Sequence, residues 1–525
     1  MTMIGSGPPP EPTNEVNASR GHAGGNDEVR IFDQPDKGRN DVPSWSDQFV
    51  ATMSQRLGGP IGRHSAGSAR WLTVTVAVIV TATLTWTIGA LQKVPCRITT
   101  SGQTVDRFAR MCYSDIPLLF RGRGLAQGNT PYLDTGSYPV LEYPVLTGAL
   151  LEFERWVTVL LGFKPTTNDQ AQFTAGVAFF DVNVVVLGVL LLVAVAAQAH
   201  TVRGRGWDAM MVAASPCLIA TGLINWDLFP VALTAVGCLL WANRRPGWAG
   251  VLWGLGMAAK LYPAFLLGPL LILCLRSRRM RPFGVTVGAF AVTWLLVNLP
   301  IMVLAPDQWL AFWTYSSNRG AGFGSIWYVL SLAGIGISHL NALTMTLFIL
   351  GCALISLLIL LAPRRPRFGQ VAFLVLFAFL ATNKVYSPQY QLWLLPFMAL
   401  ARPRWRDWWV FTVGEVVYVI GIWGHLGGFL SPGDGGADKL YWLSVLIRLG
   451  TEAWIVIMIV RDVVAPQYDP VRAPGWDDPA GGVLDRAPDA PWVERLRSGL
   501  SWRVAQSLGP MEPPPDRLDR DDRSR

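Results

Sequence analysis

Apolar runs long enough to cross a hydrocarbon layer of about 30 Å recur along this chain between residues 71 and 461. Short polar stretches separate most of these runs. The expected segments are 72–92, 173–199, 209–223, 228–242, 248–258 with 261–275, 283–304, 342–362, 369–383, 389–401, 408–425 and 440–461. The pattern predicts an all-α polytopic membrane protein with about 11–12 membrane segments.

The two ends of the chain are polar and show no periodicity. Of the 525 residues, 51% are hydrophobic and 15% are charged, whereas soluble domains average about 25% charged residues. The prediction is therefore a disordered N-terminal segment (1–70), a transmembrane domain (71–461) and a largely disordered tail (462–525). The first apolar run begins too late and is too long for a cleaved signal peptide.

Basic residues in the short loops predict the orientation. Together, 14 Lys and Arg residues lie in the loops 200–208, 243–247, 276–282, 363–368 and 402–407. The loops that alternate with them carry Lys260, Arg319, Lys384 and Lys439. The positive-inside rule therefore places the first set of loops and both termini in the cytoplasm. It also accounts for the net charge of +8 without a nucleic-acid partner.

A long polar loop, residues 93–171, follows the first apolar segment and is expected on the extracytoplasmic side. Within it, residues 144–163 are amphipathic and predict an interfacial helix, because a full crossing there would reverse the loops that follow. Residues 248–275 predict a short hairpin with Lys260 at its tip. Such a hairpin is expected to pack against protein or to line a wet cavity.

A second external region, residues 305–341, is rich in aromatic side chains. They are Trp309, Phe312, Trp313, Tyr315, Phe323, Trp327 and Tyr328. This density is typical of an interfacial belt and also suits a platform for sugar rings. Both interpretations stay open from the sequence.

Asp115, in the first loop, is the candidate for chemistry. A carboxylate near the membrane surface can accept the proton of an acceptor hydroxyl, which is worth roughly 10²–10⁴ in rate. An ordinary solvated loop aspartate is the alternative. Lys260 has an anion such as a lipid phosphate as its natural partner, or it extends to the interface as a snorkelling lysine. Arg319 and Lys384 are further phosphate candidates.

Other polar residues have structural interpretations as well. Asp227 could bind sugar hydroxyls or cap the next helix. Arg448 and Glu452, one helical turn apart, are expected to pair, with Glu415 beside them. Cys96 and Cys112 are the disulfide candidates if the first loop is extracytoplasmic. The sequence shows no metal-binding spacing, and we expect no obligatory metal and no cofactor.

Several of these motifs resemble glycosyltransferase family 87 of actinobacteria, whose members have the GT-C fold. The resemblance covers roughly residues 72–461. It rests on Ser114-Asp115, Arg121, Gly128-x-x-x-Tyr132, Tyr143-Pro144, Ala249-Gly250 with Lys260-x-x-Pro263, and Ser387-Pro388 before Trp393-Leu394-Leu395-Pro396. Many members carry a histidine near the last element, where this chain has Gln389 and Gln391.

The resemblance implies a plasma-membrane mannosyltransferase of the polyprenol-phosphate-dependent type. Asp115 matches the catalytic acid of the family, and Lys260, Arg319 and Lys384 would bind the donor phosphate. Substrate contacts are expected from Arg121, Tyr132, Tyr143, Asp227, Gln389 and Gln391. The partners would be a polyprenyl-phosphate-linked sugar, a glycolipid or glycan acceptor, and membrane lipids.

Two other classes of protein fit the hydrophobic pattern. A transporter or flippase of lipid-linked sugars predicts internal repeats and charges near the membrane midplane, and no convincing repeat is visible. A non-catalytic membrane protein of cell-wall assembly predicts that changes at Asp115 and Lys260 are silent.

Overall fold

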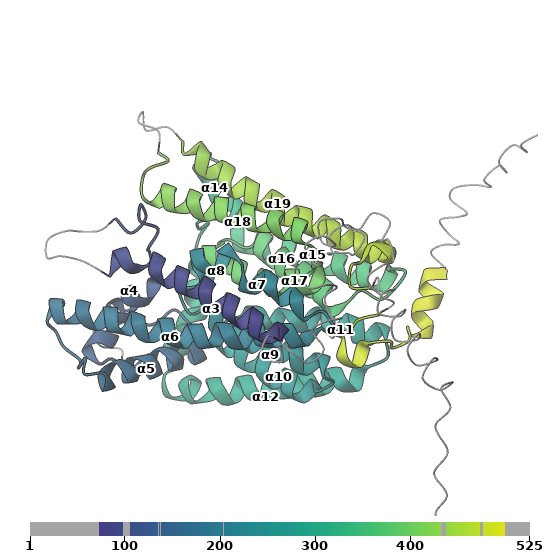
Figure 1. The fold of residues 1–525 in the computed structure, drawn as a ribbon, viewed down its shortest axis with the longest axis horizontal. Helices are drawn as coiled ribbons and strands as arrows, with labels where there is room; N and C mark the ends of the chain where they lie inside the picture. Colours follow the sequence, from purple (N-terminus) through teal and green to yellow (C-terminus); the bar gives the residue numbers. More distant parts are fainter. Residues whose placement is uncertain are drawn as a thin grey trace, which may run out of the picture. The chain divides into compact units, whose positions relative to one another are not determined.

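The computed structural model describes residues 73–97, 106–134, 136, 138–202, 204–431, 437–472 and 476–498. Every regular element among them is a helix (Figure 1). The α-helices are α3 (Val74–Gln92), α4 (Asp115–Gly122), α5 (Val145–Leu160), α6 (Asp169–Thr201), α7 (Met210–Ala213), α8 (Pro216–Thr221), α9 (Leu228–Ala242), α10 (Pro246–Ala259), α11 (Leu267–Arg276), α12 (Met280–Leu304), α13 (Pro306–Asn318), α14 (Ile326–Leu332), α15 (Leu340–Leu361), α16 (Phe368–Thr382), α17 (Gln391–Ala401), α18 (Trp405–Leu426) and α19 (Lys439–Val464). The expected segment 1–70 lies outside the described residues. Residues 74–403 and the described residues from 407 onward belong to one unit, within which all contacts below lie; the described residues of the other unit are Thr73 and Arg404–Arg406.

The structure confirms the all-α, multi-pass character of the protein. Among the described helices, six are long and apolar enough to cross a membrane: Val74–Cys96, Asp169–Thr201, Met280–Leu304, Leu340–Leu361, Trp405–Leu426 and Lys439–Val464. Shorter apolar helices cover Leu228–Ala242, Tyr262–Arg276 and Phe368–Thr382. The 11 or 12 segments that the sequence predicted include these shorter apolar helices.

One predicted crossing, residues 209–223, is broken. α7 ends at Ala213 and α8 begins at Pro216, with the Ser215 hydroxyl accepting a hydrogen bond from Cys217 N–H at 3.3 Å. Proline has no N–H to continue the first helix, while serine is a favoured N-cap for the second. The apolar pattern alone concealed this turn.

α10 packs closely against its neighbours α9 and α12. A Cβ atom on Gly250 would lie 2.2 Å from Thr286 O, and one on Gly254 would lie 2.6 Å from Phe290 O, both in α12. Only glycine allows two helix backbones to approach this closely. These two residues therefore fix the position of α10, which ends at Lys260.

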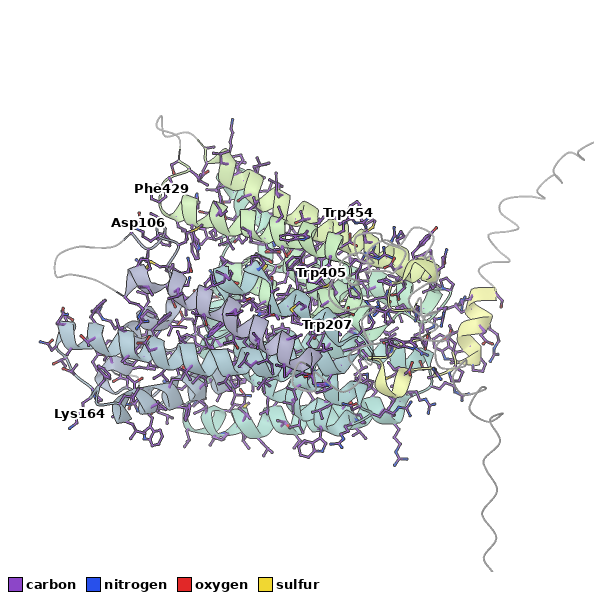
Figure 2. All side chains as sticks on the ribbon, in the orientation of Figure 1. Asp106, Lys164, Trp207, Trp405, Phe429 and Trp454 are labelled. Atoms are coloured by element: carbon purple, nitrogen blue, oxygen red, sulfur yellow. A yellow bond between two sulfur atoms is a disulfide. The ribbon has the colours of Figure 1, made fainter. Side chains whose placement is uncertain are left out.

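Several long elements run between two ends of this unit. α3 begins beside α6 at His200, with a Thr75–His200 hydrogen bond of 3.0 Å, and ends beside the first loop. α19 begins at Lys439 and ends near Arg402. We call the end that holds Asp115, Asp227 and Lys260 the site end. Asp106, Lys164 and Phe429, from distant parts of the sequence, lie at this same end (Figure 2).

The opposite end, which we call the arginine end, is defined by Arg276, Arg365, Arg367 and Arg402. Arg367 is 1% exposed and donates to both carboxylate oxygens of Asp469, at 2.8 and 2.9 Å. Arg365 pairs with Asp477 at 2.8 Å, and Arg276 pairs with Asp489 at 2.5 Å. Arg402 forms ion pairs with Asp407 and Asp462.

These pairs correct the prediction that the tail from residue 462 is largely disordered. α19 continues to Val464, and the side chains of Asp469, Asp478, Leu484 and Val493 are buried. The low hydrophobicity of this segment suggested disorder, but its aspartates neutralise arginines of the preceding loops. We call residues 465–472 and 476–498 the return segment. The remainder of the tail lies outside the described residues.

α19 carries the predicted pair of Arg448 and Glu452, whose Nη1 and Oε2 atoms lie 3.3 Å apart. The Arg448 guanidinium carbon is 3.5 Å from the centre of the Tyr386 ring, and Tyr386 donates its hydroxyl proton to Glu415 at 3.1 Å. All of these side chains are buried. The cluster has the structural character that the sequence indicated.

Candidate functional site

Asp115 begins α4, and the chain around it is fixed by its neighbours. The Ser114 hydroxyl accepts a hydrogen bond from Ile116 N–H at 3.2 Å and thus caps the helix. Asp115 N–H donates to Ile224 O at 2.7 Å, which joins the first loop to the turn between α8 and α9. Positions 114–116 are therefore held in place relative to Asp227, three residues beyond Ile224.

The carboxylate of Asp115 has one hydrogen-bond partner at the site. The Tyr113 hydroxyl donates to Asp115 Oδ1 at 2.6 Å. Among the described residues, no Lys or Arg forms an ion pair with it. Removal from water raises the pKa of Asp115 above its usual range, while the Tyr113 hydrogen bond and the positive charge of Lys260 oppose the rise. A half-buried carboxylate with a raised pKa is a suitable proton acceptor.

Lys260 lies at the C-terminal end of α10, where the helix stops and the backbone becomes extended. Its ammonium group is 2.8 Å from Asp227 Oδ1 and 4.8 Å from the centre of the Tyr143 ring. The second oxygen of Asp227 accepts a hydrogen bond from Trp393 Nε1 at 3.2 Å. The arrangement combines an ion pair with cation–π contact in a largely desolvated place.

The structure therefore favours one alternative for each of these residues. Asp227 is 1% exposed and makes no side-chain cap to α9. Lys260, whose side chain is 14% exposed, faces inward rather than extending to an interface. Lys260 pairs with Asp227, and among the described residues Asp115 forms no ion pair of its own.

Tyr132 and Tyr143 have different places in the site. The Tyr132 hydroxyl donates to Tyr143 O at 2.7 Å, and its ring covers Gly148, where a Cβ atom would lie 2.3 Å from the ring. Tyr132 therefore supports the chain at Tyr143. Tyr143 itself contacts Lys260 with its ring and accepts a hydrogen bond from Asn225 Nδ2 at 3.2 Å.

Lys384 and Arg319, the two further candidates for phosphate binding, differ in how many of their hydrogen-bond donors are already used. Lys384 Nζ donates to Ser316 O at 3.0 Å, Ser317 O at 3.1 Å and Asn341 Oδ1 at 2.5 Å. An ammonium group has three donors, so those of Lys384 are used within the protein. Arg319 is exposed at the end of α13, and among the described residues no carboxylate pairs with it.

Three other residues that were predicted to contact the substrate form no hydrogen bond or ion pair with Asp115 in the described structure. Arg121 is partly exposed on α4 and lies 3.8 Å from Asp169. Gln391 is fully buried and donates to Pro388 O at 2.9 Å and Thr221 Oγ1 at 3.3 Å. Gln389 is 4% exposed, and its side-chain oxygen has no hydrogen-bond partner among the described residues.

An aromatic pocket opens next to Lys260. Leu261 and Tyr143 line it, together with side chains of α12 and α13. Its aromatic lining is Tyr132, Tyr143, Trp294, Trp309, Phe312 and Trp313. Part of the aromatic region that the sequence left open between a belt and a sugar platform thus forms a concave surface beside the charged groups.

Sequence reasoning missed three residues of the site. Tyr113 is two positions from Asp115, and Trp393 and Tyr390 place their rings 5.9 Å from Lys260 Nζ. The sequence analysis selected Gln389 and Gln391 from the stretch that follows Ser387-Pro388, and not these two aromatic residues. Among the described residues, no group of three His, Cys, Asp or Glu side chains is arranged to hold a metal ion.

The first loop is also closed covalently. Cys96 and Cys112 form a disulfide with a Cα–Cα distance of 5.7 Å. The other cysteines in the described parts of the chain, at positions 217, 238, 274 and 352, are free. A disulfide beside the candidate site fits an oxidising compartment.

Comparison with known families agrees with this picture. Residues 158–383 match the model described as glycosyltransferase family 87. A comparison with curated proteins finds no match. The matched segment includes Asp227, Lys260 and Arg319, whereas Asp115 precedes it. The resemblance seen in the sequence is confirmed over residues 158–383, where this helical membrane protein is similar to glycosyltransferase family 87.

Proposed function

We propose that this glycosyltransferase moves a sugar, which we take to be mannose, from a polyprenyl-phosphate carrier to a hydroxyl group of a glycolipid or cell-envelope glycan. Asp115 would remove the proton of the acceptor hydroxyl as its oxygen attacks the anomeric carbon. The bond from that carbon to the carrier phosphate would break on the opposite side. A β-linked donor would thus give an α-glycoside.

The observation that carries the proposal is the Asp115 carboxylate, which has no ion pair among the described residues and lies beside the half-buried Lys260 and the aromatic pocket. Lys260 supplies positive charge near Asp115, and Arg319 offers a free guanidinium. Phosphate is bound well by such donors. The leaving group is already an anion, so the reaction needs no general acid at this site.

The aromatic pocket supports a lipid-linked donor. It lies beside Lys260 and between α12 and α13, and α12 exposes Leu295, Leu296 and Leu299 along its length. We infer that the first isoprene units occupy this pocket while the phosphate faces Lys260 and Arg319. Lys384 would then serve to hold the end of α13 in place.

The positions of the disulfide and of the basic loops support a site on the extracytoplasmic side, as expected for a GT-C glycosyltransferase. The Cys96–Cys112 disulfide lies at the site end, whereas the basic loops lie at the arginine end. Disulfides persist on the oxidising side of the plasma membrane, and basic loops remain on the cytoplasmic side. We therefore infer that both termini are cytoplasmic.

The test is sugar transfer from radiolabelled decaprenyl-phosphomannose in membranes that contain the wild type or Asp115→Asn. We expect a labelled glycolipid from the wild type and a loss of roughly 10²–10⁴ in rate for the variant. Asp169→Asn, at a carboxylate that is 93% exposed, is the matched control and should keep full activity.

A fully active Asp115→Asn enzyme would contradict the proposed base. If wild-type membranes form no product, the same assay with polyprenyl-phosphate-linked arabinose decides whether the sugar was wrong. Movement of the intact donor across vesicles without transfer would instead indicate a transporter.

A further inference from the structure

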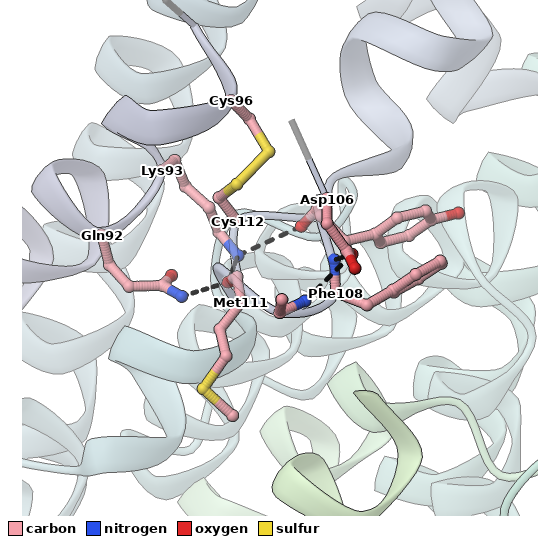
Figure 3. The surroundings of a disulfide bond; sticks show 9 residues. Gln92, Lys93, Cys96, Asp106, Phe108, Met111 and Cys112 are labelled. Carbon is pink, nitrogen blue, oxygen red and sulfur yellow. Dashed lines mark hydrogen bonds between the residues drawn. A yellow bond between two sulfur atoms is a disulfide. The ribbon is translucent and has the colours of Figure 1, made fainter. Parts of the chain in front are cut away.

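The short chain that leads to Asp115 is fastened to the end of the first membrane helix. Cys96 follows α3 in the turn η1 (Val94–Cys96), and Cys112 precedes Asp115 by three residues. Figure 3 shows the disulfide with Gln92 and Lys93 on one side and the 106–112 turn on the other. The loop between the two cysteines is thus closed directly next to the proposed base.

Lys93 adds polar contacts to the same segment. Its side chain is 1% exposed, and its ammonium group donates to Tyr113 O at 3.1 Å and to Met111 O at 3.4 Å. Gln92 Nε2 also donates to Met111 O (Figure 3). A buried lysine that donates to backbone carbonyls fixes those carbonyls in position.

The turn needs such support because its backbone is strained. Met111 has φ of 52°, in the left-handed region that non-glycine residues seldom adopt. The turn closes with a hydrogen bond from Cys112 N–H to Arg107 O at 3.0 Å. Without an external restraint, we expect this segment to relax and to carry Tyr113 with it.

The ring of Tyr113 is held by aromatic contacts from two directions. Its centre lies 5.5 Å from the Phe108 ring, which is stacked on it, and 5.2 Å from the Trp423 ring of α18. From this position its hydroxyl reaches Asp115 Oδ1 at 2.6 Å. Each link from the disulfide to the carboxylate is therefore a direct contact.

We propose that the Cys96–Cys112 disulfide and Tyr113 act as one positioning device for the Asp115 carboxylate, so that full transferase activity requires the disulfide. Tyr113 is a positioning residue here, and it takes no part in the proton transfer. The inference rests on the proposed role of Asp115. It adds that the site is completed by oxidation of the folded first loop.

The redox step is an ordinary thiol–disulfide exchange. The thiols of Cys96 and Cys112 lose two protons and two electrons to a disulfide-bearing oxidant, which becomes a dithiol. In the reverse direction, dithiothreitol gives two electrons and two protons to the protein disulfide and becomes a cyclic disulfide. The enzyme would therefore be less active where thiols remain reduced.

The first arm of the test measures Tyr113→Phe in the full-length enzyme with radiolabelled decaprenyl-phosphomannose. The variant loses the hydrogen bond that favours the charged carboxylate, so the acidic limb of kcat/KM should move to higher pH. The donor KM should stay the same, because Tyr113 does not touch the phosphate site. An unchanged acidic limb would overturn the role of Tyr113.

The second arm compares Cys96→Ser/Cys112→Ser, and wild type reduced with dithiothreitol, with the untreated enzyme. We expect kcat to fall about 10- to 100-fold, as for a misplaced catalytic group, and to recover when the reduced wild type is reoxidised. Cys352→Ser, at a free cysteine of α15, is the control and should match the wild type before and after reduction. Wild-type kcat in the double variant would overturn the role of the disulfide.

A substrate-independent readout separates this inference from the proposed function. The infrared carboxyl band that disappears in Asp115→Asn is titrated in the wild type, Tyr113→Phe and the reduced protein. A midpoint raised in the latter two supports the device even if the donor sugar is wrong, and an unchanged midpoint refutes it. If reduction unfolds the protein, as shown by thermal unfolding in detergent, the Tyr113→Phe titration alone decides.

Discussion

The two ends of the helical unit treat buried charge in opposite ways. At the arginine end, Arg367 has a bidentate partner in Asp469 and donates further to Leu400 O and Ala401 O. At the site end, Lys260 and Asp227 neutralise each other and Asp115 is left without an ion pair among the described residues. Arg367 thus uses all three nitrogens of its guanidinium group within the protein, whereas Asp115 keeps bonding capacity for a substrate.

This difference teaches how to separate structural charges from functional ones. Buried ion pairs that are fully satisfied contribute to a defined structure. A partly desolvated group with a shifted pKa and unused bonding capacity indicates a place for a substrate. Mutations at the arginine end should therefore change stability, and mutations at the site end should change turnover.

The largest expected effect is on stability, at the arginine end. Arg367→Met removes the bidentate partner of the buried Asp469 and leaves it only the more distant Arg472, at 3.9 Å, which costs roughly 3–5 kcal/mol. Thermal unfolding of the detergent-solubilised protein measures the loss. The double variant Arg367→Met/Asp469→Leu should recover most of it, and turnover per folded molecule should be unchanged in both. A loss of turnover in the double variant would show that the arginine end takes part in function.

Next in size is the loss of the site-end cation. Lys260→Met should lower kcat by about 10²-fold, because the enzyme loses the charge that stabilises the departing phosphate. The added change Asp227→Asn should restore stability but not turnover. Recovery of turnover in the double variant would mean that the pair only holds the structure, as the pairs at the arginine end do.

A smaller effect distinguishes the two outer cations. Arg319→Gln should raise the donor KM about 10-fold, the amount expected for one charge-assisted hydrogen bond to phosphate. Lys384→Gln should raise it less and should instead lower the unfolding temperature, because Lys384 holds the end of α13. Steady-state kinetics at several donor concentrations measure both values. The reverse order of KM changes would assign the phosphate contact to Lys384.

The smallest effect concerns Glu154 on α5, a buried acid that belongs neither to the arginine end nor to the charged residues of the candidate site. Burial raises the pKa of Glu154 from 4.5 to about 8, against the hydrogen bond from Trp226 Nε1. The folded state therefore binds a proton more tightly than the unfolded state, and stability contributed by the protonated acid is lost as the pH rises from about 4.5 to 8. Glu154→Gln should remove this pH dependence in thermal unfolding while leaving transfer unchanged. A steeper dependence in the variant would contradict the assignment.

The sequence predicted much of the fold because long apolar helices impose a strong pattern. The segments at 72–92, 173–199, 283–304, 342–362 and 440–461 each overlap a helix long enough to cross a membrane. The break at Pro216 was not predicted because it lies within a segment that is apolar on both sides. The ordered structure of the return segment was not predicted because its aspartates pair with arginines that are distant in the sequence. No local sequence pattern indicates such pairs.

The candidate site was predicted in its charges but not in its contacts. Asp115 and Lys260 were singled out because charge is rare near membrane segments. Their relations to Tyr113 and Asp227 depend on the turn after α8 and on the end of α10, which come together only in the fold. The sequence also could not show that Lys384 uses its hydrogen-bond donors within the protein, because two of its partners are the backbone carbonyls of Ser316 and Ser317.

The late position of the acidic return segment has a consequence for biogenesis. Arg276, Arg365 and Arg367 are synthesised well before Asp489, Asp477 and Asp469. While the ribosome is still translating the helices between them, these arginines carry uncompensated charge, the state in which loop charge guides helix insertion. Once the last aspartates emerge, the same arginines become buried ion pairs. On the proposed cytoplasmic orientation of these loops, one set of residues would serve first as a signal for helix orientation and afterwards as part of the finished protein.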